Sequence, residues 1–147
     1  DFRKFTPTCD TNQIQDCNKE ALRNTYNNTI LYIDHMLAET INLLRKQENI
    51  DTALWYVSDH GESLGENGMY LHAAPYAVAP KEQTHVPMIF WASEDWYRHT
   101  GVSAACMKQA AGKAYSHDNL FHSVLGIHDV HTQAYQRDLD IFAVCRS

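Results

Sequence analysis

The hydrophobic residues follow a helical spacing early in the chain, where residues 18–47 carry an apolar side chain at every third or fourth position. Such a stripe indicates one buried helix face. Asn18 can cap the first turn, and Arg45 and Lys46 suit the negative end of the helix dipole. We therefore predict one long helix packed on a sheet through Leu22, Tyr26, Ile30, Ile33, Leu37, Ile41 and Leu44.

Two continuous apolar runs, residues 52–57 and 86–92, predict strands. A run without polar alternation indicates a strand buried on both faces, which is typical of a parallel sheet under helices. Residues 116–127 predict a further helix, with Ser116 or Asp118 as its cap. The order of helix, strand, long loop, strand and helix indicates the α/β class.

The connection between the two strands is long and polar. It carries Gly61, Gly65, Gly68, Pro75 and Pro80. Loops of this length inside a compact domain are usually functional. The first 16 residues also predict a loop.

Length and charge narrow the classes of function. The 147 residues, 44% of them hydrophobic, suit one domain. A formal net charge of −6 argues against general nucleic-acid binding. It leaves open a small phosphate ester, because a metal ion can supply positive charge locally. The chain has neither an initiator Met nor a secretory signal pattern, and we interpret it as part of a longer protein.

The four cysteines form no Cys-x-x-Cys pair, so the usual zinc-clip spacings are missing. Three pairings are possible. We favour Cys9 with Cys17, which closes a short polar loop, and this leaves Cys106 with Cys145. Disulfides would place the protein in an oxidising compartment. Four free thiols in a reducing cell remain the alternative.

Asp59 and His60 directly follow the first predicted strand. In open α/β sheets, ligands bind outside the carboxyl ends of the strands. A carboxylate oxygen and an imidazole nitrogen together suit zinc. Gly61 would allow a tight turn that aims both side chains at one ion. The alternative is an ordinary polar cap beside a surface histidine.

Two further residues of this loop are candidates. Glu62 could support the site or bind a second ion, or it could simply face solvent. His72 could hold a phosphate oxygen or a second ion, or it could bond a backbone carbonyl. We interpret His85 as structural and the later histidines, His117, His122, His128 and His131, as surface or core residues. Without a Gly-x-Ser-x-Gly motif, a serine hydrolase is not expected.

The segment "SDHGESLGENGMYLHAAPYAVAPKEQTHVPM" resembles the signature of the lipid A phosphoethanolamine transferases, which include the mobilised colistin-resistance enzymes. They belong to the alkaline phosphatase and sulfatase superfamily. "RKFTPTCDTNQIQDCNKEALRNTYNNTILYIDHML" and "YSHDNLFHSVLGI" extend the resemblance over nearly the whole chain. It implies a disulfide-stapled α/β/α sandwich on the periplasmic face of the bacterial inner membrane, tethered by an N-terminal membrane domain.

The resemblance also implies a reaction. Phosphoethanolamine would pass from phosphatidylethanolamine to a lipid A phosphate through a Thr nucleophile at a zinc site. Asp59 and His60 would be zinc ligands, and His72, with Glu62 nearby, would contact the phosphoryl group or a second zinc. Cys9 and Cys17 match a disulfide of the family.

The Thr nucleophile and a Glu ligand lie upstream in the family, and no Thr of this chain has a matching context. We therefore expect residues 1–147 to be the C-terminal part of the catalytic domain and to be inactive alone. Another superfamily enzyme, either a sulfatase or a phosphodiesterase, is the first alternative. A non-catalytic disulfide-stapled module is the second.

Overall fold

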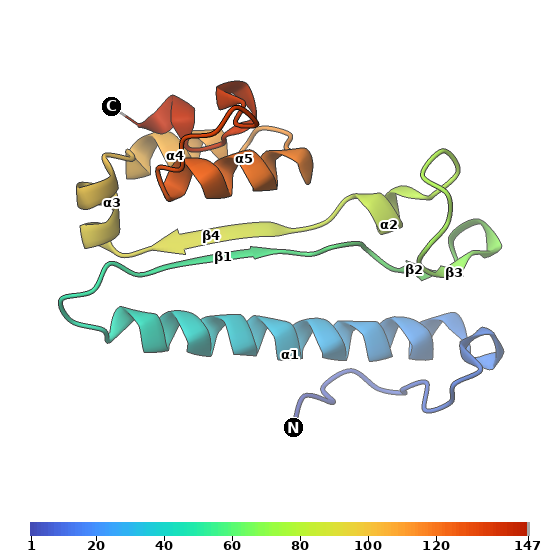
Figure 1. Cartoon of the computed structure of the whole chain (residues 1–147). Helices are drawn as coiled ribbons and strands as arrows, with labels where there is room; N and C mark the ends of the chain where they lie inside the picture. Colours follow the sequence, from blue (N-terminus) through green and yellow to red (C-terminus); the bar gives the residue numbers. More distant parts are fainter. Residues whose placement is uncertain (147) are drawn as a thin grey trace. The chain divides into compact units, whose positions relative to one another are not determined.

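The computed structural model describes residues 1–146 (Figure 1). The chain divides into two compact units. One unit consists of Asp1–Gln47 and Leu54–Trp91, and the other of Glu48–Ala53 with the residues from 92 onward. Helices and strands occur together, as predicted for the α/β class. Among the described residues, no helix combines the length and the apolar character that crossing a membrane requires.

The predicted long helix is α1, Lys19–Arg45, in the first unit. Asn18 caps it as expected, because its side chain accepts a hydrogen bond of 2.8 Å from the backbone N–H of Ala21. The apolar stripe is buried only in part. Leu22 is buried, whereas Ile30 and Ile33 are 48% and 39% exposed. Helical spacing therefore predicted the helix, but part of the predicted stripe is exposed among the described residues.

The two predicted strands are β1, Ala53–Val57, and β4, Met88–Ala92, which pair with each other. They run in opposite directions (Figure 1): Ser58 N–H donates to the Pro87 carbonyl at one end, and Ser93 N–H to the Thr52 carbonyl at the other. The prediction of parallel strands buried on both faces is therefore wrong. Most of their residues are half-buried. An apolar run reports hydrophobicity but not strand direction, and the intervening chain doubles back without a helical crossover.

The long loop contains a small hairpin. Strands β2, Ser63–Leu64, and β3, Tyr70–Leu71, pair antiparallel with Ser63 opposite Leu71. The turn between them contains the 3-10 helix η2, Glu66–Gly68, and glycines at φ +112° (Gly65) and +76° (Gly68), which other residues rarely adopt. The short helix α2, Lys81–Thr84, follows.

The second unit contains two helices that the sequence analysis missed, α3 (Glu94–Thr100) and α4 (Ala104–Ala110). Each begins after a serine, Ser93 or Ser103, whose side chain accepts a hydrogen bond from a backbone N–H of the first turn. The two serines are the sequence feature from which both helices could have been predicted. Helix α5, Asp118–Ile127, lies within its predicted range. The remaining elements are the 3-10 helices η1 (Ile14–Asp16), η3 (Arg137–Leu139) and η4 (Ala143–Cys145).

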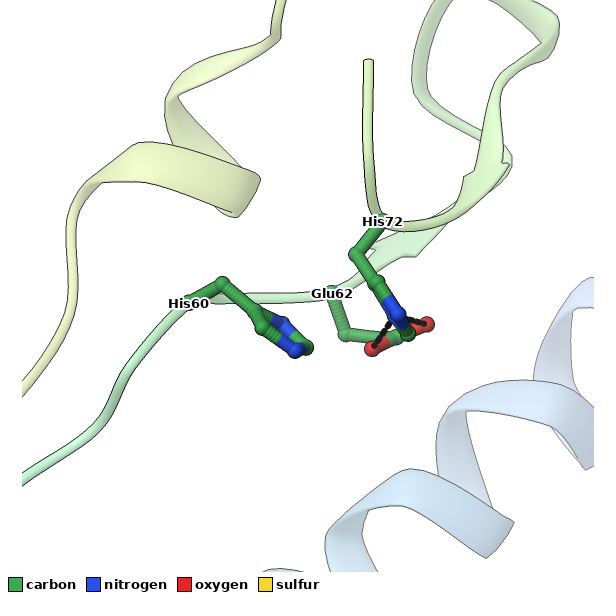
Figure 2. Close-up of side chains that lie close together, drawn as sticks. All are labelled: His60, Glu62 and His72. Carbon is green, nitrogen blue, oxygen red and sulfur yellow. Dashed lines mark hydrogen bonds and ion pairs between the residues drawn. The ribbon is translucent and has the colours of Figure 1, made fainter.

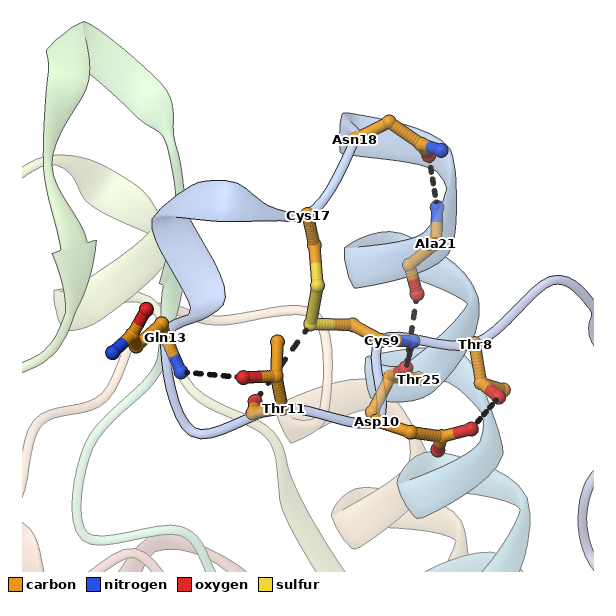
Figure 3. The surroundings of a disulfide bond; sticks show 9 residues. All are labelled: Thr8, Cys9, Asp10, Thr11, Gln13, Cys17, Asn18, Ala21 and Thr25. Carbon is orange, nitrogen blue, oxygen red and sulfur yellow. Dashed lines mark hydrogen bonds between the residues drawn. A yellow bond between two sulfur atoms is a disulfide. The ribbon is translucent and has the colours of Figure 1, made fainter.

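Both favoured disulfides are present, Cys9–Cys17 and Cys106–Cys145. Figure 3 shows the first one at the start of α1. The backbone N–H of Cys9 donates to the Thr25 hydroxyl at 2.8 Å, and that hydroxyl donates to the Ala21 carbonyl. The disulfide loop is therefore attached to the helix by hydrogen bonds as well as by packing.

Candidate metal and phosphate site

The hairpin brings two distant histidines face to face. Asp59 and His60 follow β1, and the chain turns through β2 and β3 before it reaches His72. The rings of His60 and His72 stack with centroids 4.0 Å apart and planes at 27° (Figure 2). The two residues are 12 positions apart in the sequence, so only the hairpin turn makes this contact.

Three predicted site residues form a group that matches the ligands of a metal ion. His60, Glu62 and His72 each offer one ligand atom, and these atoms all lie within 4.8 Å of one another. Two imidazole nitrogens and a carboxylate oxygen are donors that zinc prefers. The fourth candidate, Asp59, lies beside His60 and is mostly exposed, with 89% of its side chain accessible.

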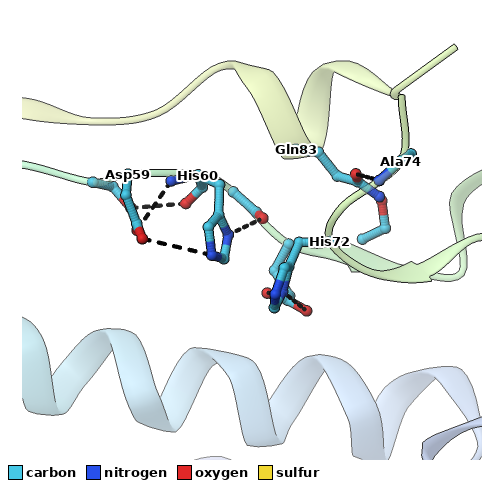
Figure 4. Close-up of polar contacts among 9 residues, drawn as sticks. Asp59, His60, His72, Ala74 and Gln83 are labelled. Atoms are coloured by element: carbon cyan, nitrogen blue, oxygen red, sulfur yellow. Dashed lines mark hydrogen bonds and ion pairs between the residues drawn. The ribbon is translucent and has the colours of Figure 1, made fainter. Parts of the chain in front are cut away.

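Hydrogen bonds orient the ring of His60 (Figure 4). Its Nδ1 lies 3.0 Å from the Gly61 carbonyl oxygen, which can only accept, so Nδ1 carries the proton. In the neutral ring the lone pair is then on Nε2, which lies 3.7 Å from Asp59 Oδ2. Metal-binding histidines are commonly held in this way, with one nitrogen bonded to the protein and the other free to coordinate. The Asp59 carboxylate and the Nε2 atom of His60 therefore lie close enough to bind the same ion.

Glu62 lies against His72. Its carboxylate accepts from Nδ1 of His72, with Oε2 at 3.2 Å. This contact leaves Nε2 of His72 as the atom available to a ligand.

Gly61 has a different role from the predicted one. Its φ lies outside the left-handed region, so the turn does not need a glycine for conformational freedom. Instead, a Cβ atom at this position would lie 1.9 Å from the backbone oxygen of Glu82. The N–H of Gly61 donates to the Gln83 carbonyl at 2.9 Å. Glycine is required because α2 packs directly on the backbone next to His60.

Backbone strain surrounds His72. Its two neighbours, Leu71 and Ala73, have φ values of +63° and +72°. Residues with a Cβ atom avoid this region, at a cost of order 1–2 kcal/mol each. Such strain persists only where the surrounding structure enforces it, and here it sets the direction in which His72 projects.

The other histidines lie where the sequence analysis expected surface or core residues. His122 is buried, and its Nδ1 accepts from the backbone N–H of Gln136 at 3.0 Å. His117, His128 and His131 are exposed. His85 is exposed at the end of α2. No motif in the sequence marks Gln83, whose buried side chain contacts two segments of the site.

The fold and this site define a class. The sulfatase family model matches residues 1–130, and the chain belongs to the sulfatase family. It is 54% identical over 147 residues to the phosphoethanolamine transferase EptA of Escherichia coli strain K12, covering 99% of this chain and 27% of that protein. It is 42% identical over 130 residues to the phosphatidylethanolamine transferase Mcr-1 of E. coli, covering 88% of this chain and 23% of Mcr-1.

A solved structure agrees. The integral membrane protein lipooligosaccharide phosphoethanolamine transferase A (EptA) of Neisseria meningitidis matches with a TM-score of 0.94 at 52% identity, over 99% of this chain and 27% of that one. The match confirms the predicted sulfatase-like α/β fold. The chain thus spans about a quarter of the length of the relatives it matches.

Proposed function

We propose that this chain is the C-terminal part of the catalytic domain of a zinc-dependent enzyme that transfers phosphoethanolamine from phosphatidylethanolamine to a lipid A phosphate. Such a modification of lipid A would confer resistance to polymyxins, including colistin. The observation that carries the proposal is the convergence of His60, Glu62 and His72, with Asp59 beside them. Similarity to named phosphoethanolamine transferases supports this reaction over other sulfatase-family chemistry.

The donor set fits zinc. Asp59 and His60 would hold the ion, completed by ligands from the rest of the protein, because a catalytic site normally takes three protein ligands. Bound zinc would lower the pKa of a nucleophile and offset charge on the phosphoryl group. Since this chain has only part of such a site, residues 1–147 alone should bind zinc weakly and be inactive.

His72 would hold the phosphoryl group. Its Nδ1 is bonded to Glu62, so Nε2 can donate a hydrogen bond to a phosphoryl oxygen when the ring is protonated. Such fixed donors supply much of the catalysis in phosphoryl transfer, which depends on positioning and electrostatics. A second zinc ion held by His72 and Glu62 is an alternative use of the same atoms.

The surface next to His72 supports a lipid donor. Leu71, Tyr76 and Val78 are 52%, 87% and 60% exposed, all within ten residues of His72. Exposed aromatic and aliphatic side chains on one short loop suit the boundary between lipid headgroups and acyl chains. We assign this loop, residues 71–80, to the diacylglycerol part of phosphatidylethanolamine, whose headgroup would lie at His72.

The two disulfides favour an oxidising compartment such as the periplasm. A place on the periplasmic face of the inner membrane, with an N-terminal membrane domain as anchor, agrees with the membrane location of the matched Neisseria enzyme. Phosphatidylethanolamine and lipid A would both be reached there.

The test uses the whole protein that contains this chain, incubated with fluorescent phosphatidylethanolamine and lipid A. Labelled diacylglycerol and phosphoethanolamine-modified lipid A should both appear, and a zinc chelator should abolish them. Headgroup release that does not need lipid A would indicate a phosphodiesterase instead. No turnover of phosphate or sulfate esters by the zinc-loaded protein would favour the non-catalytic module. Residues 1–147 alone serve as the inactive control.

A further inference from the structure

We propose that Gln83 is a positioning residue for this site and holds the segments of His60, Glu62 and His72 in register. The inference rests on the proposed function for its catalytic consequence, but its structural basis is independent of it. Gln83 lies in α2 and is only 6% exposed. It touches none of the reacting groups and would act through their neighbours.

The side-chain amide of Gln83 bridges the two arms of the site (Figure 4). Its Nε2 donates to the Ser63 hydroxyl oxygen at 2.8 Å, and Ser63 is fully buried next to Glu62. Its Oε1 accepts from the backbone N–H of Ala74 at 3.2 Å, two residues after His72. One amide therefore uses both its donor and its acceptor to join the segments that carry Glu62 and His72.

The backbone of Gln83 adds a third connection. Its carbonyl accepts from the N–H of Gly61, the residue after His60, at 2.9 Å. The space here is closed, because the backbone of Glu82 would contact a Cβ atom on Gly61 at 1.9 Å. His60, Glu62 and His72 are therefore each followed, one or two positions later, by a residue that is bonded to Gln83.

These bonds also explain how strain near His72 is maintained. Ala73, at φ +72°, lies between His72 and Ala74. The Gln83–Ala74 bond fixes one side of this residue, and the pairing of Ser63 with Leu71 in the hairpin fixes the other. Since Ser63 is itself bonded to Gln83, removal of the amide should loosen both sides of His72 together.

The test compares Gln83→Met with the parent in the whole protein. Methionine has a similar size and keeps the backbone bond to Gly61, but it lacks the amide. Hydrogen exchange followed by mass spectrometry should show faster exchange of the Ala74 amide in a peptide covering residues 72–80, at an almost unchanged Tm. This readout does not depend on activity or on bound zinc.

In the transfer assay, kcat of Gln83→Met should fall about 10- to 100-fold, as expected for a misplaced catalytic group, with a smaller change in KM. Asn28→Ala is the control, because it removes hydrogen bonds between buried Asn28 of the same unit and the backbone of Lys4 and Phe5, and none in the site loop. It should lower Tm at least as much and leave kcat near the parent value. Adding Ser63→Ala to Gln83→Met should lower kcat little further, since the Gln83–Ser63 bond that Ser63→Ala removes is already lost in Gln83→Met.

The possible results distinguish the positioning role of Gln83 from the proposed function. Unchanged exchange over residues 72–80 in Gln83→Met, or an unchanged kcat in an active parent, would overturn the positioning role. So would a kcat loss that simply follows Tm across Gln83→Met and Asn28→Ala. If the parent itself transfers no phosphoethanolamine, the proposed function fails, and the exchange result alone then decides the role of Gln83.

Discussion

The imidazole rings of His60 and His72 stack with centroids 4.0 Å apart, yet each is oriented by a different partner. His60 is bonded through Nδ1 to the Gly61 carbonyl, and His72 through Nδ1 to Glu62. The backbone carbonyl is neutral, whereas the carboxylate is charged. The first ring is therefore held by the backbone of its own segment, with Nε2 facing Asp59, whereas the second is held by a carboxylate, with Nε2 available to a phosphoryl oxygen.

This difference predicts distinct effects of replacing each histidine in the whole protein. His60→Ala should remove zinc and activity together, because a direct ligand is lost. His72→Ala should retain the first zinc ion and slow transfer by about 10²–10³-fold, the usual cost of one lost contact to a developing charge. Zinc content by mass spectrometry and turnover, measured on the same samples, give the comparison. Zinc retained in His60→Ala would contradict the assignment of the metal site.

Gly61→Ala should damage the site through packing alone. The new Cβ atom would meet the backbone oxygen of Glu82 at 1.9 Å, and no side chain can rotate away to relieve this contact. Either α2 or the segment of His60 must move, so we expect a loss of order 1–3 kcal/mol and a large fall in activity. Gly112→Ala is the control, since its nearest atom would be 3.7 Å away. Thermal unfolding and turnover measure both effects, and a fully active Gly61→Ala would refute the close contact.

Ala73→Gly should stabilise the protein. Ala73 has φ +72°, and glycine adopts this conformation without steric cost, so we expect a gain of about 1 kcal/mol. The same change at Ala105, an exposed position in α4, should instead lose about 1 kcal/mol. Chemical denaturation of the two variants should therefore shift in opposite directions. A shift in the same direction would mean that Ala73 is not strained.

The lipid-facing assignment of residues 71–80 predicts an effect on substrate capture. Tyr76→Ser with Val78→Ser should raise KM for phosphatidylethanolamine vesicles at least tenfold, since full burial of even one large apolar side chain is worth about 1.5–3 kcal/mol. The chemistry is untouched, so kcat should stay near the parent value. Ala77→Ser in the same loop should change neither constant. An equal KM increase with a water-soluble, short-chain donor would argue against an acyl-chain contact.

The second unit offers a test by pH. Tyr135 donates a hydrogen bond of 2.8 Å to buried Asp140, and burial together with that bond raises the pKa of the Tyr135 phenol above its ordinary value of 10.0. The raised pKa contributes stability that is fully present below pH 10 and is lost as the pH rises through the folded-state value. Tyr135→Phe should cost about 1 kcal/mol at pH 7.

The difference in unfolding free energy between parent and Tyr135→Phe should shrink above pH 10, because only the parent has this phenol to ionise. Tyr76→Phe is the matched control, since Tyr76 is 87% exposed, and it should be neutral at every pH. Denaturation at a series of pH values provides the measurement. A difference that stays constant through pH 11 would show that the Tyr135 phenol ionises equally in both states.

The sequence by itself determined the elements whose signals are local. Helix α1 follows from side chains spaced every three or four residues and from Asn18, whose cap needs only the first turn. Strands β1 and β4 follow from two apolar runs, and the position of Asp59 and His60 after β1 follows from chain order. The Cys9–Cys17 disulfide agrees with the short separation of these two cysteines. The second disulfide, Cys106–Cys145, joins the pair that then remained.

Tertiary structure decided what depends on contacts between distant segments. The antiparallel direction of β1 and β4 depends on the path of the chain between them, which an apolar run does not encode. The requirement for Gly61 comes from the backbone of Glu82, and the strain at Ala73 comes from its flanking bonds. Gln83 shows the same limit most clearly. A glutamine in a short polar stretch carries no pattern, and only the folded chain places its amide between Ser63 and Ala74, where burial makes both bonds matter.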